Sequence, residues 1–108
     1  MGRHSMGEFE QLVMVAALRL APDGYGVSIV EEIEDRTGRD VSQAAAYLTL
    51  KRLEEKGWLN GRQVEGGEDR GHRERRCFEV TPEGRERLAQ AHMEFTTMWE
   101  GLAGEVGR

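Results

Sequence analysis

The chain has 108 residues, 38% of them hydrophobic and 32% charged, with a net charge of −5. Length and composition predict one globular domain and exclude a disordered protein, and no apolar run reaches the about 18 residues that would indicate a membrane helix. The single cysteine, Cys77, excludes an internal disulfide and suits a reducing cytoplasm, where we expect the protein; no secretory h-region follows the N-terminus.

Residues 7–20 predict a first helix. Phe9, Leu12, Ala16 and Leu20 follow the helical period, and the central segment LVMVAAL is apolar on nearly every side. A helix that is apolar all round is buried all round. In a chain of this size, that pattern suggests that a second chain covers the helix. The alternative is that this helix forms the centre of a monomeric core.

A turn with Pro22 and Gly24 leads to a second predicted helix, which begins near Tyr25 and ends near Thr37. Its buried stripe and its acidic, solvated face are separate. The stripe consists of Ile29, Val30 and Ile33, and the acidic face consists of Glu31, Glu32, Glu34 and Asp35. Gly38 ends the helix as a left-handed cap.

The third predicted helix lies between Asp40 and Gly57 and follows the second after a short connection, as a helix-turn-helix requires. Ser42 is its expected cap, and Gly57 its expected stop. One face is apolar, and the other is small near its start and basic further along. The apolar face consists of Ala46, Leu50 and Leu53, and the outer face of Ala44, Ala45, Leu48, Lys51, Arg52 and Glu55. This outer face suits a DNA major groove.

Two predicted strands follow, over residues 58–64 and 75–80, with the charged, glycine-rich segment GGEDRGHRE between them. By the period of two, Phe78 and Val80 point inward, and Arg75, Cys77 and Glu79 take the other face. A helix followed directly by a long-tipped hairpin is the plan of a winged helix-turn-helix. The wing is basic, because Arg70, Arg73, Arg75 and Arg76 stand against the single acid Glu74. An acidic chain with a basic wing is compatible with DNA binding.

The last predicted helix begins at Thr81-Pro82-Glu83, where threonine caps, proline fits the first turn and glutamate suits the helix dipole. Its apolar residues step by three and four, as in a heptad seam. The seam consists of Leu88, Ala91, Phe95, Met98 and Leu102, and a second stripe of His92, Trp99 and Val106. We expect this helix to pack on a partner chain.

Three segments resemble the PadR-type transcriptional regulators. They are YGVSIVEEIE from Tyr25, VSQAAAYLTLKRLEEKGWL from Val41, and RRCFEVTPEGRERL from Arg75. The resemblance implies a mainly α (α+β) winged helix-turn-helix with a two-stranded wing, a homodimer, and the small-tailed subgroup with one long C-terminal helix. Two positions depart from the family pattern. Family members usually have a larger residue at the position of Ala46, and often a small residue or proline at the position of Leu48. The departures bear on base contacts more than on fold.

We therefore expect a DNA-binding domain over residues 7–80 and a C-terminal dimerisation helix over residues 81–108. The candidate DNA contacts are Ser42, Gln43, Tyr47, Lys51, Arg52, Arg73 and Arg75. Gln43, at the start of the third helix, suits a bidentate contact to adenine, or simply points to solvent. Tyr47 is either a phosphate contact or a core tyrosine with its hydroxyl at the surface, and Ser42 combines capping with phosphate contact.

The candidate dimer residues are Leu12, Leu88, Phe95, Met98, Trp99 and Leu102. Some family members bind planar drugs or phenolic acids between their subunits, so a small aromatic effector at Phe95 and Trp99 is a further expectation. The alternative for Trp99 is a plain interface tryptophan, since tryptophans are common interface hot spots without any ligand.

No catalytic set, metal-ligand spacing or glycine-rich phosphate loop is recognisable, so we expect no enzyme, no metal and no cofactor. The favoured hypothesis is a homodimeric transcriptional repressor that binds an operator in double-stranded DNA and contacts no membrane. The alternative is a winged helix that binds another protein instead of DNA. Only DNA binding would weaken steeply with salt, because each neutralised phosphate releases counterions.

Overall fold

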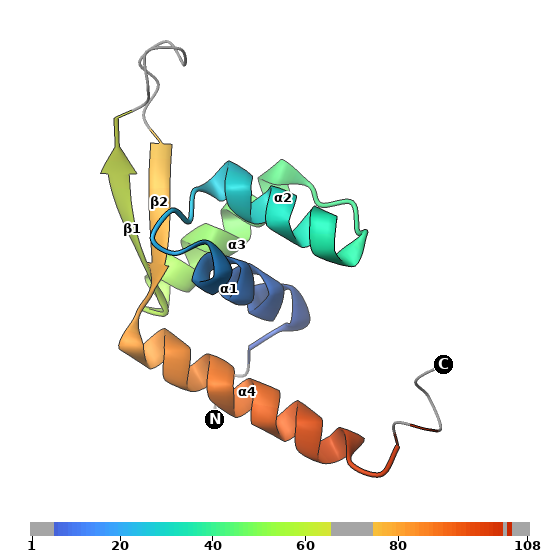
Figure 1. Cartoon of the computed structure of the whole chain (residues 1–108). Helices are drawn as coiled ribbons and strands as arrows, with labels where there is room; N and C mark the ends of the chain where they lie inside the picture. Colours follow the sequence, from blue (N-terminus) through green and yellow to red (C-terminus); the bar gives the residue numbers. More distant parts are fainter. Residues whose placement is uncertain (1–5, 66–74, 103, 105–108) are drawn as a thin grey trace.

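The computed structural model describes residues 6–65, 75–102 and 104. Four helices and a two-stranded antiparallel sheet follow one another along the chain (Figure 1). Their bounds are α1 Glu8–Leu20, α2 Gly26–Thr37, α3 Gln43–Glu55, β1 Leu59–Val64, β2 Arg75–Val80 and α4 Pro82–Trp99. The predicted order of elements and the winged-helix fold class are thus confirmed.

The ends of the helices form where the local sequence predicted them. The Ser42 hydroxyl accepts a hydrogen bond of 3.1 Å from the amide of Ala45, and the Thr81 hydroxyl accepts one of 2.9 Å from the amide of Gly84. Gly38 ends α2 with a φ of 76°, a conformation in which a Cβ atom is disfavoured. These caps satisfy backbone groups that each helix leaves without an internal partner.

Helix α1 is the centre of the core and lies between α2 and α3 on one side and α4 on the other (Figure 1). Val13 and Met14 have no exposed surface. The prediction that a second chain covers this helix is wrong for most of its surface, because the chain's own elements surround it. Leu12 is half-buried and packs against the core, whereas Val15 remains 41% exposed.

At Cys77 and Phe78, residues on both faces of β2 are buried, contrary to the prediction from the period of two. Phe78 points inward as expected, but Cys77, expected on the outer face, is also buried. The turn before α2 covers that second face: the amide of Phe78 donates to the carbonyl of Gly24 at 2.8 Å, and the Cys77 thiol donates to the carbonyl of Pro22 at 3.2 Å. A Cβ atom on Gly24 would lie 2.6 Å from the carbonyl oxygen of Phe78, so only glycine fits there.

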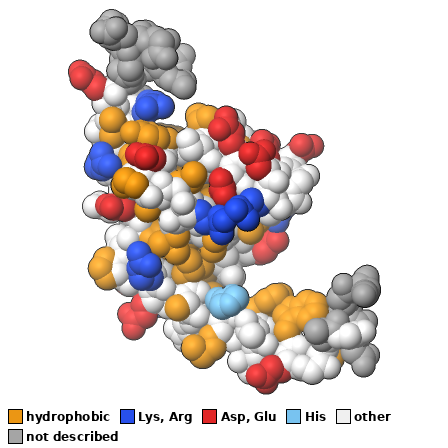
Figure 2. Space-filling view, viewed as in Figure 1, with side chains coloured by type: hydrophobic (Ala, Val, Ile, Leu, Met, Phe, Trp, Pro, Cys, Tyr) orange, Lys and Arg blue, Asp and Glu red, His pale blue; other side chains and the backbone are white. Residues whose placement is uncertain are grey.

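Helix α4 has two halves. Its first half packs on the body through Gly84 and Leu88, and its second half projects away from it (Figure 1). Leu88 belongs to the chain's own core, so the prediction that it lies in a dimer interface is wrong. Hydrophobic side chains gather over the projecting end (Figure 2). The large apolar residues exposed in this half are Met93, Phe95, Met98 and Trp99, and Leu102, predicted on the same helical seam, is exposed three residues after the helix ends. Within the part of the chain that the structure describes, no helix is long and apolar enough to cross a membrane.

Candidate nucleic-acid interface

The outer face of α3 is open to solvent. The predicted DNA contacts Ser42, Gln43, Tyr47, Lys51 and Arg52 are all exposed. Tyr47 is 55% exposed, so its ring is not a core residue, whereas Ala46, Leu50 and Leu53 face the core as predicted. The helix is held by its inner face and presents polar and cationic groups on its outer face.

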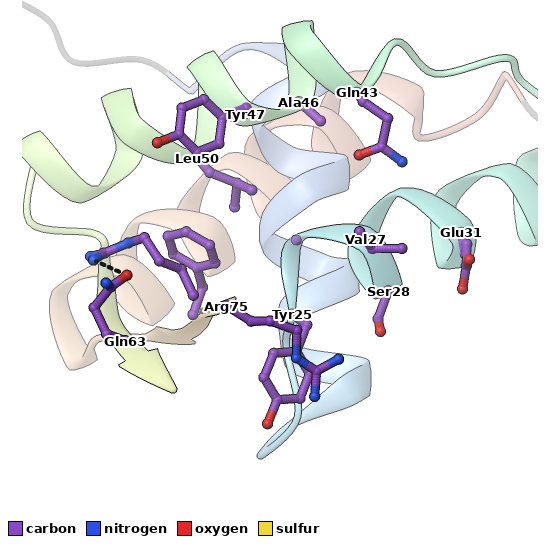
Figure 3. A pocket seen from close by; sticks show the side chains of 13 residues that line it. Tyr25, Val27, Ser28, Glu31, Gln43, Ala46, Tyr47, Leu50, Gln63 and Arg75 are labelled. Atoms are coloured by element: carbon purple, nitrogen blue, oxygen red, sulfur yellow. Dashed lines mark hydrogen bonds between the residues drawn. The ribbon is translucent and has the colours of Figure 1, made fainter. Parts of the chain in front are cut away.

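A groove of about 570 Å³ lies between α3, the first turns of α2 and the base of the wing (Figure 3). It brings together three predicted DNA contacts from two separate segments, Gln43 and Tyr47 of α3 and Arg75 of β2. Apolar side chains, including Leu50 and Phe78, form part of its wall. The further residues that line it are Tyr25, Gly26, Val27, Ser28, Glu31, Ala46, Gln63 and Arg76.

The guanidinium group of Arg75 lies over the ring of Tyr25, with its carbon atom 4.1 Å from the ring centroid. Its Nε atom is buried and has no hydrogen-bond partner among the described residues. Among residues 6–65 and 75–102, no carboxylate forms an ion pair with this side chain. Arg75 therefore carries a positive charge into the groove that the described chain leaves without a counter-charge.

Arg76 is bound within the chain. Its Nη2 atom lies 2.5 Å from Oε2 of Glu54 on α3, and its Nη1 atom lies 3.4 Å from Oε1 of Gln63 on β1 (Figure 3). The ion pair crosses directly over Gly61, where a Cβ atom would lie 2.6 Å from Nη2 and 2.9 Å from Oε2. Arg76 thus ties the wing to the end of α3.

Sequence patterns did not identify Tyr25, Glu54 or Arg76 as parts of this site. The sequence predicts Tyr25 as the start of the second helix and of one PadR-like segment, but gives it no role in binding. Glu54 and Arg76 are 22 residues apart, so no periodic pattern relates them. The pairing of β1 with β2 places Gln63 opposite Arg76 and Gly61 opposite Phe78. That register is a tertiary fact, and the arrangement of the site follows from it.

Other predicted site residues lie elsewhere. Lys51 and Arg52 do not line the groove, and Arg73 lies outside the described residues. Phe95 and Trp99, the candidate effector residues, meet edge-on in the projecting half of α4, with their ring centroids 6.1 Å apart. The candidate DNA and effector residues therefore belong to two different parts of the molecule.

The acidic residues of α2 are held by arginines on the surface. Glu32 accepts hydrogen bonds from Arg36 at 2.8 Å and from Arg19 at 3.1 Å. The bond from Arg36, with a smaller contribution from Arg19, lowers the pKa of Glu32 below the ordinary carboxyl value, and desolvation opposes this in part. The acidity of α2 is thus partly neutralised by neighbouring guanidinium groups.

A family model described as "Transcriptional regulator PadR-like family" matches residues 15–90, which confirms the resemblance inferred from the sequence. No curated protein gives a significant match.

Several solved structures share the fold. A PadR-like transcription factor from Bacteroides fragilis is similar with a TM-score of 0.72 and 19% identity, over 89% of this chain and 87% of that one. A PadR family transcriptional regulator from Eggerthella lenta has a TM-score of 0.71 and 24% identity, over 90% and 84%. Bacillus subtilis PadR, solved in complex with operator DNA, has a TM-score of 0.60 and 18% identity, over 73% of this chain and 45% of that one.

Proposed function

The chain belongs to the PadR-like family of transcriptional regulators, and from this premise we propose that it is a homodimeric repressor that binds operator DNA through α3 and the wing. The observation that best supports the proposal is the groove, which is lined by Gln43 and Tyr47 of α3 together with Arg75 of the wing. A helix that presents polar side chains beside an unneutralised arginine suits a DNA duplex, which offers base edges next to phosphates.

Within this surface, we assign base contacts to the start of α3 and phosphate contacts to its later turns. Gln43 is exposed in the first turn, where recognition helices usually reach base edges, and its amide pairs bidentately with adenine. Lys51 and Arg52, two turns later, are exposed cations suited to phosphates. Ser42 already caps α3 through its hydroxyl, and Arg73 would add a phosphate contact from the wing.

We propose that the dimer forms through the projecting half of α4. In this proposal, residues 7–80 form the DNA-binding domain, and residues 81–108 form the part of the chain that contains the dimer contact. Phe95 is 64% exposed and Met98 is 77% exposed, and no described part of the chain covers them. A second copy would bury this apolar surface. A dimer also reads two half-sites about one helical turn apart.

A small planar effector, bound beside Phe95 and Trp99, is a further part of the proposal. The edge-on pair of rings would stack with a flat aromatic compound once a second subunit encloses it. Tryptophan fluorescence would report this binding in a Trp58→Phe background, since the chain has a second tryptophan. Because the protein acts on the chromosome of its cell, we place it in the cytoplasm.

The test is a footprint of the protein on the DNA upstream of its own gene, followed by binding titrations at several salt concentrations. DNA binding should weaken steeply with salt, with a slope set by the number of phosphates contacted. Gln43→Ala should reduce the preference for operator over scrambled DNA by about 1–3 kcal/mol and leave the salt slope unchanged. Lys51→Ala is the matched control, because it should weaken binding to both DNAs equally and lower the slope by about one.

The result that would overturn the proposal is the absence of any salt-dependent binding to either DNA. The apolar end of α4 would then favour the alternative, a winged helix that binds another protein. That association should depend little on salt, since it would rest on buried apolar surface.

A further inference from the structure

Arg75 and Arg76 are neighbours in sequence but differ in their electrostatic state. Arg76 is paired with Glu54 and Gln63 within the chain. Arg75 has no ion pair in the described chain, and its buried Nε atom has no hydrogen-bond partner. A buried polar atom without a partner is costly and needs an explanation, such as an ion or ligand that completes the site.

The surroundings of Arg75 favour an anion. Figure 3 shows its guanidinium group over the ring of Tyr25. Glu31 is the only acidic residue among the described residues that line the groove. Its two helices also supply neutral donors, the hydroxyl groups of Ser28 and Tyr47 and the amide of Gln43. The groove thus combines a cation without a counter-charge in the described chain, uncharged donors and a volume of about 570 Å³, which is larger than a single water needs.

We propose that this groove is an anion site that takes a phosphodiester group of DNA, with Arg75 as its charged ligand and Tyr25 as the residue that positions Arg75. The inference rests on the proposed function and deepens it. The phosphate contact is formed at the start of β2, beside the first residues of α2.

Tyr25 is suited to position Arg75 because its own backbone is fixed to the same strand. Tyr25 forms an isolated antiparallel bridge with Cys77, and the neighbouring Gly24 carbonyl accepts the amide hydrogen of Phe78. The guanidinium group lies 4.1 Å from the ring centroid, within the range of a cation–π interaction. The ring supplies a flat surface for the guanidinium plane, so the aromatic face and not the hydroxyl should matter.

The experiment measures the salt dependence of operator binding for wild type, Arg75→Ala, Tyr25→Leu, Tyr25→Phe and the Arg75→Ala/Tyr25→Leu double variant. Arg75→Ala should lower the slope by about one, because one phosphate contact is lost, and should weaken operator and scrambled DNA equally. Tyr25→Leu should lower the slope in the same direction, whereas Tyr25→Phe should keep the wild-type slope. The double variant should equal Arg75→Ala alone, since both changes remove one contact.

The matched charge control is Arg36→Ala, which also removes one positive charge but lies at the far end of α2, paired with Glu32. Its slope should be that of wild type. Thermal unfolding of each variant identifies loss of folding. If Tyr25→Leu unfolds, the guanidinium nitrogen resonances of Arg75 in the wild type and in Tyr25→Phe provide the test, because they should shift when DNA is added.

The outcomes separate this inference from the proposed function. If wild type binds no DNA with a salt dependence, the proposed function itself fails. If wild type binds but Arg75→Ala keeps its slope, or the Arg75 resonances do not move, the anion site is overturned while the proposed function stands. If Arg75→Ala lowers the slope and a folded Tyr25→Leu does not, Arg75 is a ligand but Tyr25 does not position it.

Discussion

Helix α1 and the projecting half of α4 are both rich in apolar residues, yet they have opposite environments. The chain's own helices and β2 surround α1, so Val13 and Met14 have no exposed surface. The end of α4 leaves Phe95 and Met98 more than half exposed. An apolar pattern in the sequence therefore indicates that a helix face will be buried. Only the tertiary packing decides whether the same chain or a partner chain buries it.

The polar contacts also differ between α1 and the outer half of α4. On α1, Glu10 pairs with Lys56 at 2.9 Å and Arg19 pairs with Glu32 at 3.1 Å, so the helix is linked to two other elements. In the later turns of α4, the described side-chain hydrogen bond is the one from Gln90 to Glu94 within the same helix. Among the described residues, the outer half of α4 thus has no side-chain hydrogen bond or ion pair to the body, and its apolar packing against the core is that of Ala91.

The largest effect is expected from Met14→Ala at the centre of α1. Removal of a fully buried methionine should lower the free energy of unfolding by about 2–5 kcal/mol. Chemical denaturation at a fixed protein concentration measures it. Val15→Ala, at the adjacent, 41% exposed position, is the control and should cost about 0.5 kcal/mol or less. Equal costs at both positions would mean that a second chain covers α1 after all.

The next effect concerns the point where α4 joins the body. A Cβ atom on Gly84 would collide with the carbonyl oxygen of Trp58, so Gly84→Ala should destabilise the fold by about 1–3 kcal/mol. Gly104→Ala serves as the control, because within the described part of the chain no atom beyond its immediate neighbours lies within 4 Å of its Cβ position. Thermal unfolding of the two variants measures the difference. A Gly84→Ala protein as stable as wild type would contradict the close packing of α4 on the body.

A smaller effect is expected at the outer end of α4, and on association instead of folding. Phe95→Ala and Met98→Ala should each weaken the dimer about tenfold, since truncated interface anchors cost more than about 1 kcal/mol. Analytical ultracentrifugation over a range of concentrations measures the dissociation constant.

Met93→Ala is the matched control for these variants. Met93 is 64% exposed but lies two residues before Phe95, and so about 200° around the helix. It should leave the dimer unchanged. Equal weakening by Met93→Ala, or none by the other two, would refute the assignment of this face to a partner chain.

The smallest effect concerns the ion pairs that link α1 and α2. The pKa of Glu32 is lowered, chiefly by the hydrogen bond from Arg36, so its contribution to stability is present above the ordinary carboxyl pKa and is lost as the pH falls through the lowered value. Because these groups lie at the surface, salt should weaken the effect.

An NMR titration of the Glu32 carboxyl carbon measures this shift. Arg36→Gln should move the pKa of Glu32 back toward its ordinary value by more than Arg19→Gln does, because the hydrogen bond from Arg36 is the larger cause. A pKa that does not respond to either change would contradict the attribution.

The arrangement of the candidate site was predictable only in part. The open face of α3, with Gln43 and Lys51, followed from the helical period, because burial of Ala46, Leu50 and Leu53 leaves the opposite side to solvent. The groove did not follow, because it needs Tyr25 and Arg75 side by side, and they are brought together by the pairing of β2 with the turn before α2. No local pattern encodes a contact over that separation.

The sequence by itself determined the elements, their caps and the winged-helix class. Ser42 and Thr81 cap helices, Gly38 and Gly57 adopt positive φ, and the spacing of apolar residues distinguishes helices from strands, all through interactions within a few residues. Tertiary structure alone decided that Leu88 is core and Phe95 is not, and that Cys77 is buried. It also decided that Arg76 is paired with Glu54, whereas Arg75 has no ion pair among the described residues. The physical reason is that burial and ion pairing depend on which distant segments meet, and periodicity along the chain carries no information about that.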